Sequence, residues 1–190
     1  RAFLRDLFGN ASSEALRAGA GLALGSSLRN APDEDVRSLL EKQWRSAASL
    51  EAQLAVIDYI GNSGDTSFFA IVKEAAENQS LLLQRKAVYA TRFMESDEVN
   101  DYILGVLRRH SDDRVREKAA ESIAMHRWSD RYFDVLVRCV ESDSSTSVRI
   151  KCADFALSQP NRSADMRAVL SRITATDADM KDFIQRSLSN

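Results

Sequence analysis

The chain has 190 residues, of which 44% are hydrophobic and 28% are charged, proportions that are ordinary for a helical globular protein. Its formal net charge of −2 and its isoelectric point near 5.8 argue against a nucleic-acid-binding surface, which usually needs a strongly basic face. No apolar run approaches the roughly 18 residues that a membrane-spanning helix requires.

The first predicted helix carries apolar residues at helical spacing, including Leu4, Leu7 and Phe8, and ends near Gly9. Ser12 can cap the next helix, because a serine hydroxyl accepts a hydrogen bond from a backbone amide that would otherwise lack a partner. That second helix is rich in Gly and Ala. We therefore expect it to approach a neighbouring helix closely.

The next helix is predicted to begin at Pro32, which three acidic residues follow. Proline suits a first helical turn, and acidic side chains favour the positive end of the helix dipole. A partner helix runs from about Leu50 to Ile60. The glycine-rich stretch 61–65 after it predicts a tight reversal that needs a positive φ.

The rest of the chain continues as pairs of short helices. The predicted pairs are 66–77 with 80–94, 96–110 with 115–124, 130–141 with 145–158, and 163–175 with 177–188. Leu82 and Leu83 are both expected in the core. Arg108 and Arg109 end their helix, where positive charge complements the dipole. Helices of this length are marginal alone in water, so stability must come from packing between neighbours.

The second helices share a pattern, an apolar residue followed by Arg and then a small pair, which is clearest in Val115–Ala124. Counted from its first residue, the pattern recurs at positions 16, 50, 83, 115, 148 and 180, in steps of 32 to 34 residues. A steady period of this size indicates a helical-repeat solenoid. We predict an all-α, right-handed α-α superhelix of six helical pairs. The predicted repeats are about 1–29, 30–61, 62–94, 95–127, 128–160 and 161–190, within one domain over 1–190.

The Val115-Arg116 and Val148-Arg149 helices resemble the second helices of HEAT repeats. A narrower similarity involves Leu22–Leu28, then Tyr59–Gly64, then the two Val-Arg helices. Over residues 16–157 this order resembles the helical domain of large lipid transfer proteins, a family that includes vitellogenin and the large subunit of microsomal triglyceride transfer protein. In that family the domain is an arch that braces lipid-holding β-sheets and contacts partner subunits. This chain lacks a strand-rich segment, so a lipid role would need further domains.

The two cysteines, Cys139 and Cys152, are too few for a disulfide framework. We predict reduced core thiols, because free cysteine packs as a small hydrophobe. The two lie in paired helices, so a bridge in an oxidising compartment is the alternative, and the compartment stays open. His110 and His126 have no Cys or carboxylate at metal-ligand spacing. No metal and no cofactor are expected.

No sequence pattern indicates an active site: the chain has no glycine-rich phosphate loop, no Cys-x-x-Cys and no nucleophile–base pair. Carboxylate pairs such as Asp112 and Asp113 stand at helix starts, where a capping role is expected. Arg116 and Arg149 are predicted to bond loop acids such as Asp112 or Asp143. The chain is therefore not expected to be an enzyme.

The position three residues after each second-helix anchor is the candidate binding column, and it reads Gln53, Lys86, Lys118 and Lys151. If second helices line a concave face, these lysines form a ladder that binds a partner, with apolar area added by Tyr89 and Met125. The alternative is a solvated face on which Lys118–Glu121 and Lys151–Asp154 form ion pairs three residues apart.

We predict a non-enzymatic scaffold for protein–protein interaction whose partner contributes an acidic segment. The chain starts at Arg1 and carries apolar residues at both ends, among them Phe3 and Phe183, so we expect flanking domains of the same chain or self-association. One alternative is a bracing module of a lipid- or lipoprotein-handling protein, and another is a HEAT-like DNA-binding or DNA-repair domain. Neither nucleic-acid binding nor direct membrane insertion is expected.

Overall fold

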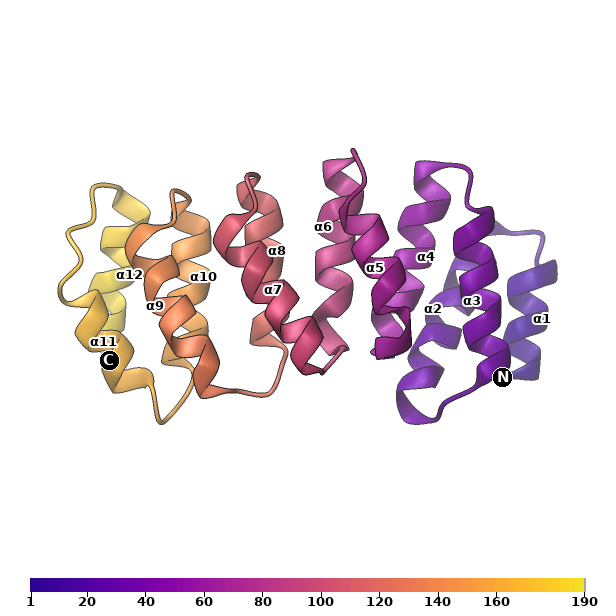
Figure 1. The fold of residues 1–190 in the computed structure, drawn as a ribbon, viewed down its shortest axis with the longest axis horizontal. Helices are drawn as coiled ribbons and strands as arrows, with labels where there is room; N and C mark the ends of the chain where they lie inside the picture. The colour runs from indigo at the N-terminus through magenta and orange to yellow at the C-terminus, as the bar shows by residue number, and fades with distance from the viewer. Residues whose placement is uncertain (190) are drawn as a thin grey trace. The chain divides into compact units, whose positions relative to one another are not determined.

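The computed structural model describes residues 1–189, and every regular element in this range is helical (Figure 1). The all-α prediction is confirmed. The described residues form two compact units, unit 1 (residues 1–101) and unit 2, which begins at Tyr102. The helix α7 (Asp97–Arg109) starts in unit 1 and ends in unit 2. None of the described helices is long and apolar enough to span a bilayer.

Unit 1 contains three helical pairs arranged in two layers. Its elements are α1 (Ala2–Asn10), α2 (Glu14–Asn30), α3 (Glu34–Ser46), α4 (Leu50–Ser63), the 3-10 helix η1 (Thr66–Phe68), α5 (Phe69–Ala76), α6 (Leu81–Ala90) and the 3-10 helix η2 (Thr91–Phe93). The second helices α2, α4 and α6 pack side by side, while α1, α3 and α5 each pack on the second helix that follows. Short amphipathic helices thus bury their apolar faces between the two layers.

Glycine allows the close packing of α2 on α4 that the sequence predicts. A Cβ atom on Gly25 would lie 2.1 Å from the carbonyl oxygen of Tyr59, and one on Gly21 would lie 2.6 Å from the Tyr59 ring. A larger residue at position 25 would meet the backbone of α4 and move the helices apart, whereas one at position 21 would displace the Tyr59 ring. Gly64 ends α4 with φ of 64°, which confirms the predicted reversal with positive φ.

Unit 2 repeats the two-layer packing along its own helices. After the end of α7 follow α8 (Asp113–Ala124), the 3-10 helix η3 (Asp130–Tyr132), α9 (Phe133–Ser142), α10 (Thr146–Leu157), α11 (Ser163–Leu170) and α12 (Ala178–Ser189). The second helix α10 packs between α8 and α12, and α9 packs on α10. Ala119 and Ala120 on α8 and Cys152 and Ala153 on α10 are buried.

The helix caps correct one predicted cap residue and the register of one predicted repeat. Ser13, not Ser12, is the N-cap residue of α2, and its side chain makes no capping bond. The Ser49 hydroxyl accepts a hydrogen bond from the amide of Ala52, as Asp112 does from Val115, so Ala52 and not Leu50 occupies the anchor position. Gln53 therefore corresponds to Arg116 and does not belong to the lysine column.

Two further sequence predictions are wrong. Leu82 is 43% exposed, because Leu83 is the residue of α6 that fills the core at the anchor position. Cys139 and Cys152 form a disulfide, whereas reduced thiols were predicted. The packing of α9 against α10 brings their Cα atoms to 6.4 Å, a separation that a disulfide spans. Both half-cystines are buried.

Candidate functional site

Each lysine of the predicted ladder has a carboxylate partner. In unit 1, Lys86 on α6 pairs with Asp58 on the neighbouring α4. In unit 2, Lys118 and Lys151 share Glu121: the distances from Nζ to the Glu121 carboxylate are 2.5 and 2.9 Å. Within unit 2 the structure therefore brings Lys118 and Lys151 together, across α8 and α10, with an acidic group between them.

The charges of this unit 2 cluster largely neutralise one another. Glu117 adds a second carboxylate oxygen, 3.5 Å from Nζ of Lys151. Burial raises the pKa of Glu121, but the hydrogen bonds from Lys118 and Lys151 outweigh it and leave the pKa below its usual range. The hydrogen bond to Glu121 raises the pKa of Lys151. The predicted Lys118–Glu121 pair is confirmed, and the predicted Lys151–Asp154 pair is wrong because Lys151 reaches α8 instead.

The two apolar members of the predicted site lie in different units. Tyr89, on α6 of unit 1, is partly buried, and the guanidinium of Arg92 lies 4.5 Å from its ring centroid. Met125 follows the last residue of α8 in unit 2 and is 52% exposed. Met125 is thus available as apolar contact area, whereas Tyr89 already packs against a cation.

The arginine column is structural, and the predicted bond to a loop acid is confirmed for Arg116, whereas Arg149 bonds a backbone carbonyl. Arg116 is 7% exposed and its guanidinium donates two hydrogen bonds to Asp143, at 2.8 and 2.7 Å. It also donates to the carbonyl oxygen of His110 at 2.8 Å. The hydrogen bond to Asp143 raises the pKa of Arg116. Arg149 donates to the carbonyl of Val140 at 2.7 Å, again at the end of a preceding helix.

The same role recurs at equivalent positions of unit 1. Arg17 donates to the carbonyl of Ala11 at 2.9 Å, and Gln84 donates to that of Asn78 at 2.6 Å. Each of these residues lies four positions after the N-cap of its second helix, as Arg116 does. Because the final carbonyls of a helix lack intrahelical partners, these side chains satisfy them and fix the turn.

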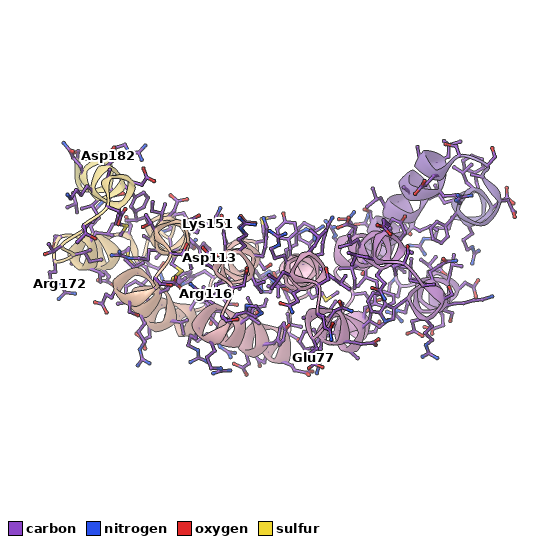
Figure 2. All side chains as sticks on the ribbon, turned by 90° about the horizontal axis from the view of Figure 1, so that it is seen from above. Glu77, Asp113, Arg116, Lys151, Arg172 and Asp182 are labelled. Carbon is purple, nitrogen blue, oxygen red and sulfur yellow. A yellow bond between two sulfur atoms is a disulfide. The ribbon has the colours of Figure 1, made fainter. Side chains whose placement is uncertain are left out.

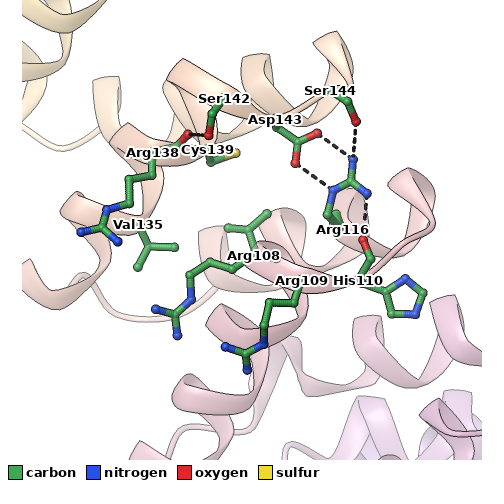
Figure 3. A pocket seen from close by; sticks show the side chains of 11 residues that line it. Arg108, Arg109, His110, Arg116, Val135, Arg138, Cys139, Ser142, Asp143 and Ser144 are labelled. Atoms are coloured by element: carbon green, nitrogen blue, oxygen red, sulfur yellow. Dashed lines mark hydrogen bonds and ion pairs between the residues drawn. The ribbon is translucent and has the colours of Figure 1, made fainter.

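A cleft in unit 2 contains functional candidates that the sequence analysis missed (Figure 3). It has a volume of about 430 Å³, an apolar floor and a basic rim. The floor includes Leu107, Val135 and Cys139, and the rim includes the exposed Arg108, Arg109 and Arg138; the buried Arg116–Asp143 pair also lines the cleft. In Figure 2, Lys151 lies on the outer side of the α8–α10 layer, whereas Arg116 lies on the side that faces α9 and this cleft.

Neither histidine is placed for metal chemistry. His110 accepts a hydrogen bond at Nδ1 from the amide of Asp112 at 3.1 Å, and His126 is buried. Among residues 1–189, no group of three or more His, Cys, Asp or Glu side chains is arranged to hold a metal ion. The capping role predicted for Asp112 is confirmed by its bond to the amide of Val115 at 3.1 Å.

Comparison with known proteins shows a shared fold and no family. No protein-family model matches the chain, and no curated protein matches it. Among solved structures, the chain is similar to a crystal structure titled as an engineered protein, a target of the Northeast Structural Genomics Consortium. The two are 16% identical, the match covers 98% of this chain and 95% of the other, and the TM-score is 0.56. This likeness shows the all-helical fold alone.

Proposed function

We propose that the chain is a non-enzymatic HEAT-like solenoid, a right-handed superhelix of six helical pairs, that presents its second helices to a partner protein. The pairing of α1 with α2, α3 with α4, α5 with α6, α9 with α10 and α11 with α12 supports this architecture, as does the side-by-side packing of second helices in each unit. A solenoid offers an extended surface that is ordered before binding, so association costs little conformational entropy.

One observation carries the proposal: exposed large apolar side chains concentrate on the second helices. Of the eight such residues in the described chain, only Phe3 lies on a first helix. The other seven lie on second helices or directly after one, and they are Leu16, Leu22, Leu50, Leu81, Leu82, Met125 and Leu188. Apolar side chains collected on one kind of element are typical of an interaction surface.

The lysines have a secondary part in this proposal. Lys86 lies on α6 with the exposed Leu81 and Leu82, and Lys118 and Lys151 lie on the second helices α8 and α10, but each lysine already interacts with a carboxylate. An acidic partner would have to compete with Asp58, Glu117 and Glu121 for them, which lowers the net gain. The leucines therefore supply the contact area, and the lysines set the orientation of the partner.

The residues behind the lipid-transfer resemblance have packing roles in this chain. Gly25 contacts Tyr59 closely, a Cβ on Gly61 would lie 2.8 Å from Cα of Ala90, and Gly64 provides a positive φ. These packing roles account for the glycines in the two segments that resemble lipid transfer proteins, without a lipid function. A lipid-bracing module therefore gains no support beyond the resemblance itself.

Site-specific photo-crosslinking in cells tests the scaffold proposal. A photoreactive phenylalanine analogue is placed at position 82 on α6 or position 125 after α8. Matched controls carry it at position 70 on α5 or position 168 on α11, both exposed on first helices and outside the cleft of unit 2. We expect a defined partner to crosslink to positions 82 and 125. Equal crosslinking from all four positions, or crosslinking from 70 and 168 alone, would contradict the proposal.

A further inference from the structure

We propose that the basic cleft of unit 2 binds an acidic segment of a partner protein, whose carboxylates are held by Arg108, Arg109 and Arg138. The inference rests on the proposed scaffold function and names a second contact site for its partner. The three arginines come from the end of α7 and from α9, and Figure 3 shows their guanidinium groups directed to the same side of the cleft.

The three guanidinium groups have no carboxylate partner among residues 1–189. Arg108 donates from Nε to the carbonyl of Leu104 at 3.2 Å, a contact that orders its stem along α7. Arg109 lies against Gly105, where a Cβ atom would stand 2.9 Å from its terminal nitrogen. Both side chains are exposed at their ends, so their remaining donors face the cleft opening and solvent. Arginine donors of this kind bind carboxylates through paired hydrogen bonds.

The charge balance of the cleft favours an anion. Four arginines line it, and the single acidic lining residue, Asp143, is already held by Arg116 through two hydrogen bonds. The chain as a whole has a net charge of −2, so this local excess of positive charge is a feature of the cleft and not of the protein. Complementary charge of this kind steers an acidic partner and sets its register.

The cleft floor favours a protein segment over an inorganic anion or a nucleic acid. Leu107 and Val135 contribute apolar side chains, and the volume of about 430 Å³ accommodates several side chains of a peptide. No Phe, Tyr or Trp is among the described lining residues, so the cleft lacks the large aromatic rings on which successive bases usually stack. An acidic segment with an apolar residue in it matches both the rim and the floor.

The cleft is also held in shape before binding. The disulfide from Cys139, in the floor, ties α9 to α10. The Arg116–Asp143 pair ties α8 to the turn after α9 and is nearly excluded from solvent, with side chains 9% and 8% exposed. A preorganised site loses less entropy when its ligand binds.

Fluorescence anisotropy of the 190-residue chain with a labelled acidic peptide tests the proposal. The peptide is an octamer of six glutamates around two central leucines, and an octamer with glutamines in place of the glutamates is its control. The test variant combines Arg108→Ser, Arg109→Ser and Arg138→Ser. The matched control combines Arg45→Ser, Arg114→Ser and Arg172→Ser, three exposed arginines outside the cleft, so that both variants have the same net charge.

We expect saturable binding of the acidic peptide by the wild-type chain, weakening as ionic strength rises. The cleft variant is expected to bind at least about tenfold more weakly, and the control variant to bind within about threefold of wild type. If circular dichroism shows that the cleft variant is unfolded, Arg138→Ser alone replaces it and is expected to weaken binding about threefold.

Three results would overturn the inference. Equal affinity of the cleft variant and the control variant would place the acidic peptide elsewhere. Absence of saturable binding by the wild-type chain up to about 1 mM peptide would show that the cleft does not bind an acidic segment. Tighter binding of a labelled DNA duplex than of the peptide would make the cleft a nucleic-acid contact. None of these results alters crosslinking from positions 82 and 125, so failure of the cleft and failure of the scaffold proposal are distinguishable.

Discussion

Gly25→Ala tests the close packing of α2 on α4 that holds unit 1 together. The added Cβ would lie 2.1 Å from the carbonyl oxygen and 2.9 Å from the carbonyl carbon of Tyr59. The obstructing atoms belong to backbone inside α4, so no side-chain rotation relieves the clash. The two helices must separate by about 1 Å, which weakens the contacts around Gly21, Leu24 and Tyr59.

The expected loss combines two opposing effects. Overpacking of a close helix contact costs about 1–3 kcal/mol, and the higher helix propensity of alanine returns about 0.5–1 kcal/mol. The net loss is about 0–2.5 kcal/mol relative to wild type, which lowers the melting temperature of a chain of this size by up to roughly 10 °C, and about 1–3 kcal/mol relative to an alanine variant without the clash.

Gly19→Ala is the matched control, since a Cβ at this exposed position of the same helix meets nothing within 4 Å. It retains the propensity gain without the clash, so its melting temperature should rise by roughly 1–4 °C. Thermal melting followed by circular dichroism compares the two variants. Equal or higher stability of Gly25→Ala would refute the predicted contact between α2 and α4.

Four other predictions concern packing, pH, the disulfide and the lysines. Ala119→Leu, at a fully buried position of α8, should cost about 1–3 kcal/mol in a melting experiment, whereas Ala124→Leu on the exposed side should cost little. The pKa of Glu121 is lower in the folded chain than its unfolded-state value near 4.5, so its ion pairs stabilise the fold above that pH and stop doing so as pH falls through the folded pKa. Glu121→Gln lacks this titrating group. Between neutral and acidic pH it should therefore lose less stability than wild type does. Mass spectrometry without reduction should recover Cys139 and Cys152 in one linked peptide, and replacing both with Ser should destabilise the chain by about 3 kcal/mol, because the closed loop is short. Lys86→Gln, Lys118→Gln and Lys151→Gln together should cost only about 0–1 kcal/mol per ion pair in chemical denaturation, and a much larger loss would mean that these pairs are central to the fold.

The repeating helical pattern is readable from sequence because apolar residues recur with the period of a helix and the pairs recur with a longer period. The register of the α4 repeat is not readable in the same way. Leu50 looks like the anchor of this repeat, and only the hydrogen bond from the amide of Ala52 to Ser49 shows that α4 begins later in the pattern. A shift of this size moves Gln53 from the lysine column to the arginine column.

The candidate sites differ in how far sequence could reach them. Arginine recurs at one position of the second helices, and Asp143 lies in the loop after the first helix of the next repeat. This recurrence beside an acidic loop residue was enough to predict the Arg116–Asp143 pair. The arginine cleft joins the end of α7 to Arg138 on α9, two positions with no shared motif. The Cys139–Cys152 bond likewise depends on the packing of α9 against α10, which composition does not specify.

The ratio of partner crosslinked from position 82 to that crosslinked from position 70 tests the central claim most directly. Both positions are exposed in unit 1, one on the second helix α6 and the other on the first helix α5 of the same pair. The scaffold account predicts that position 82 yields several times more of one defined partner. A ratio near one, or a larger yield from position 70, would contradict binding through the second helices.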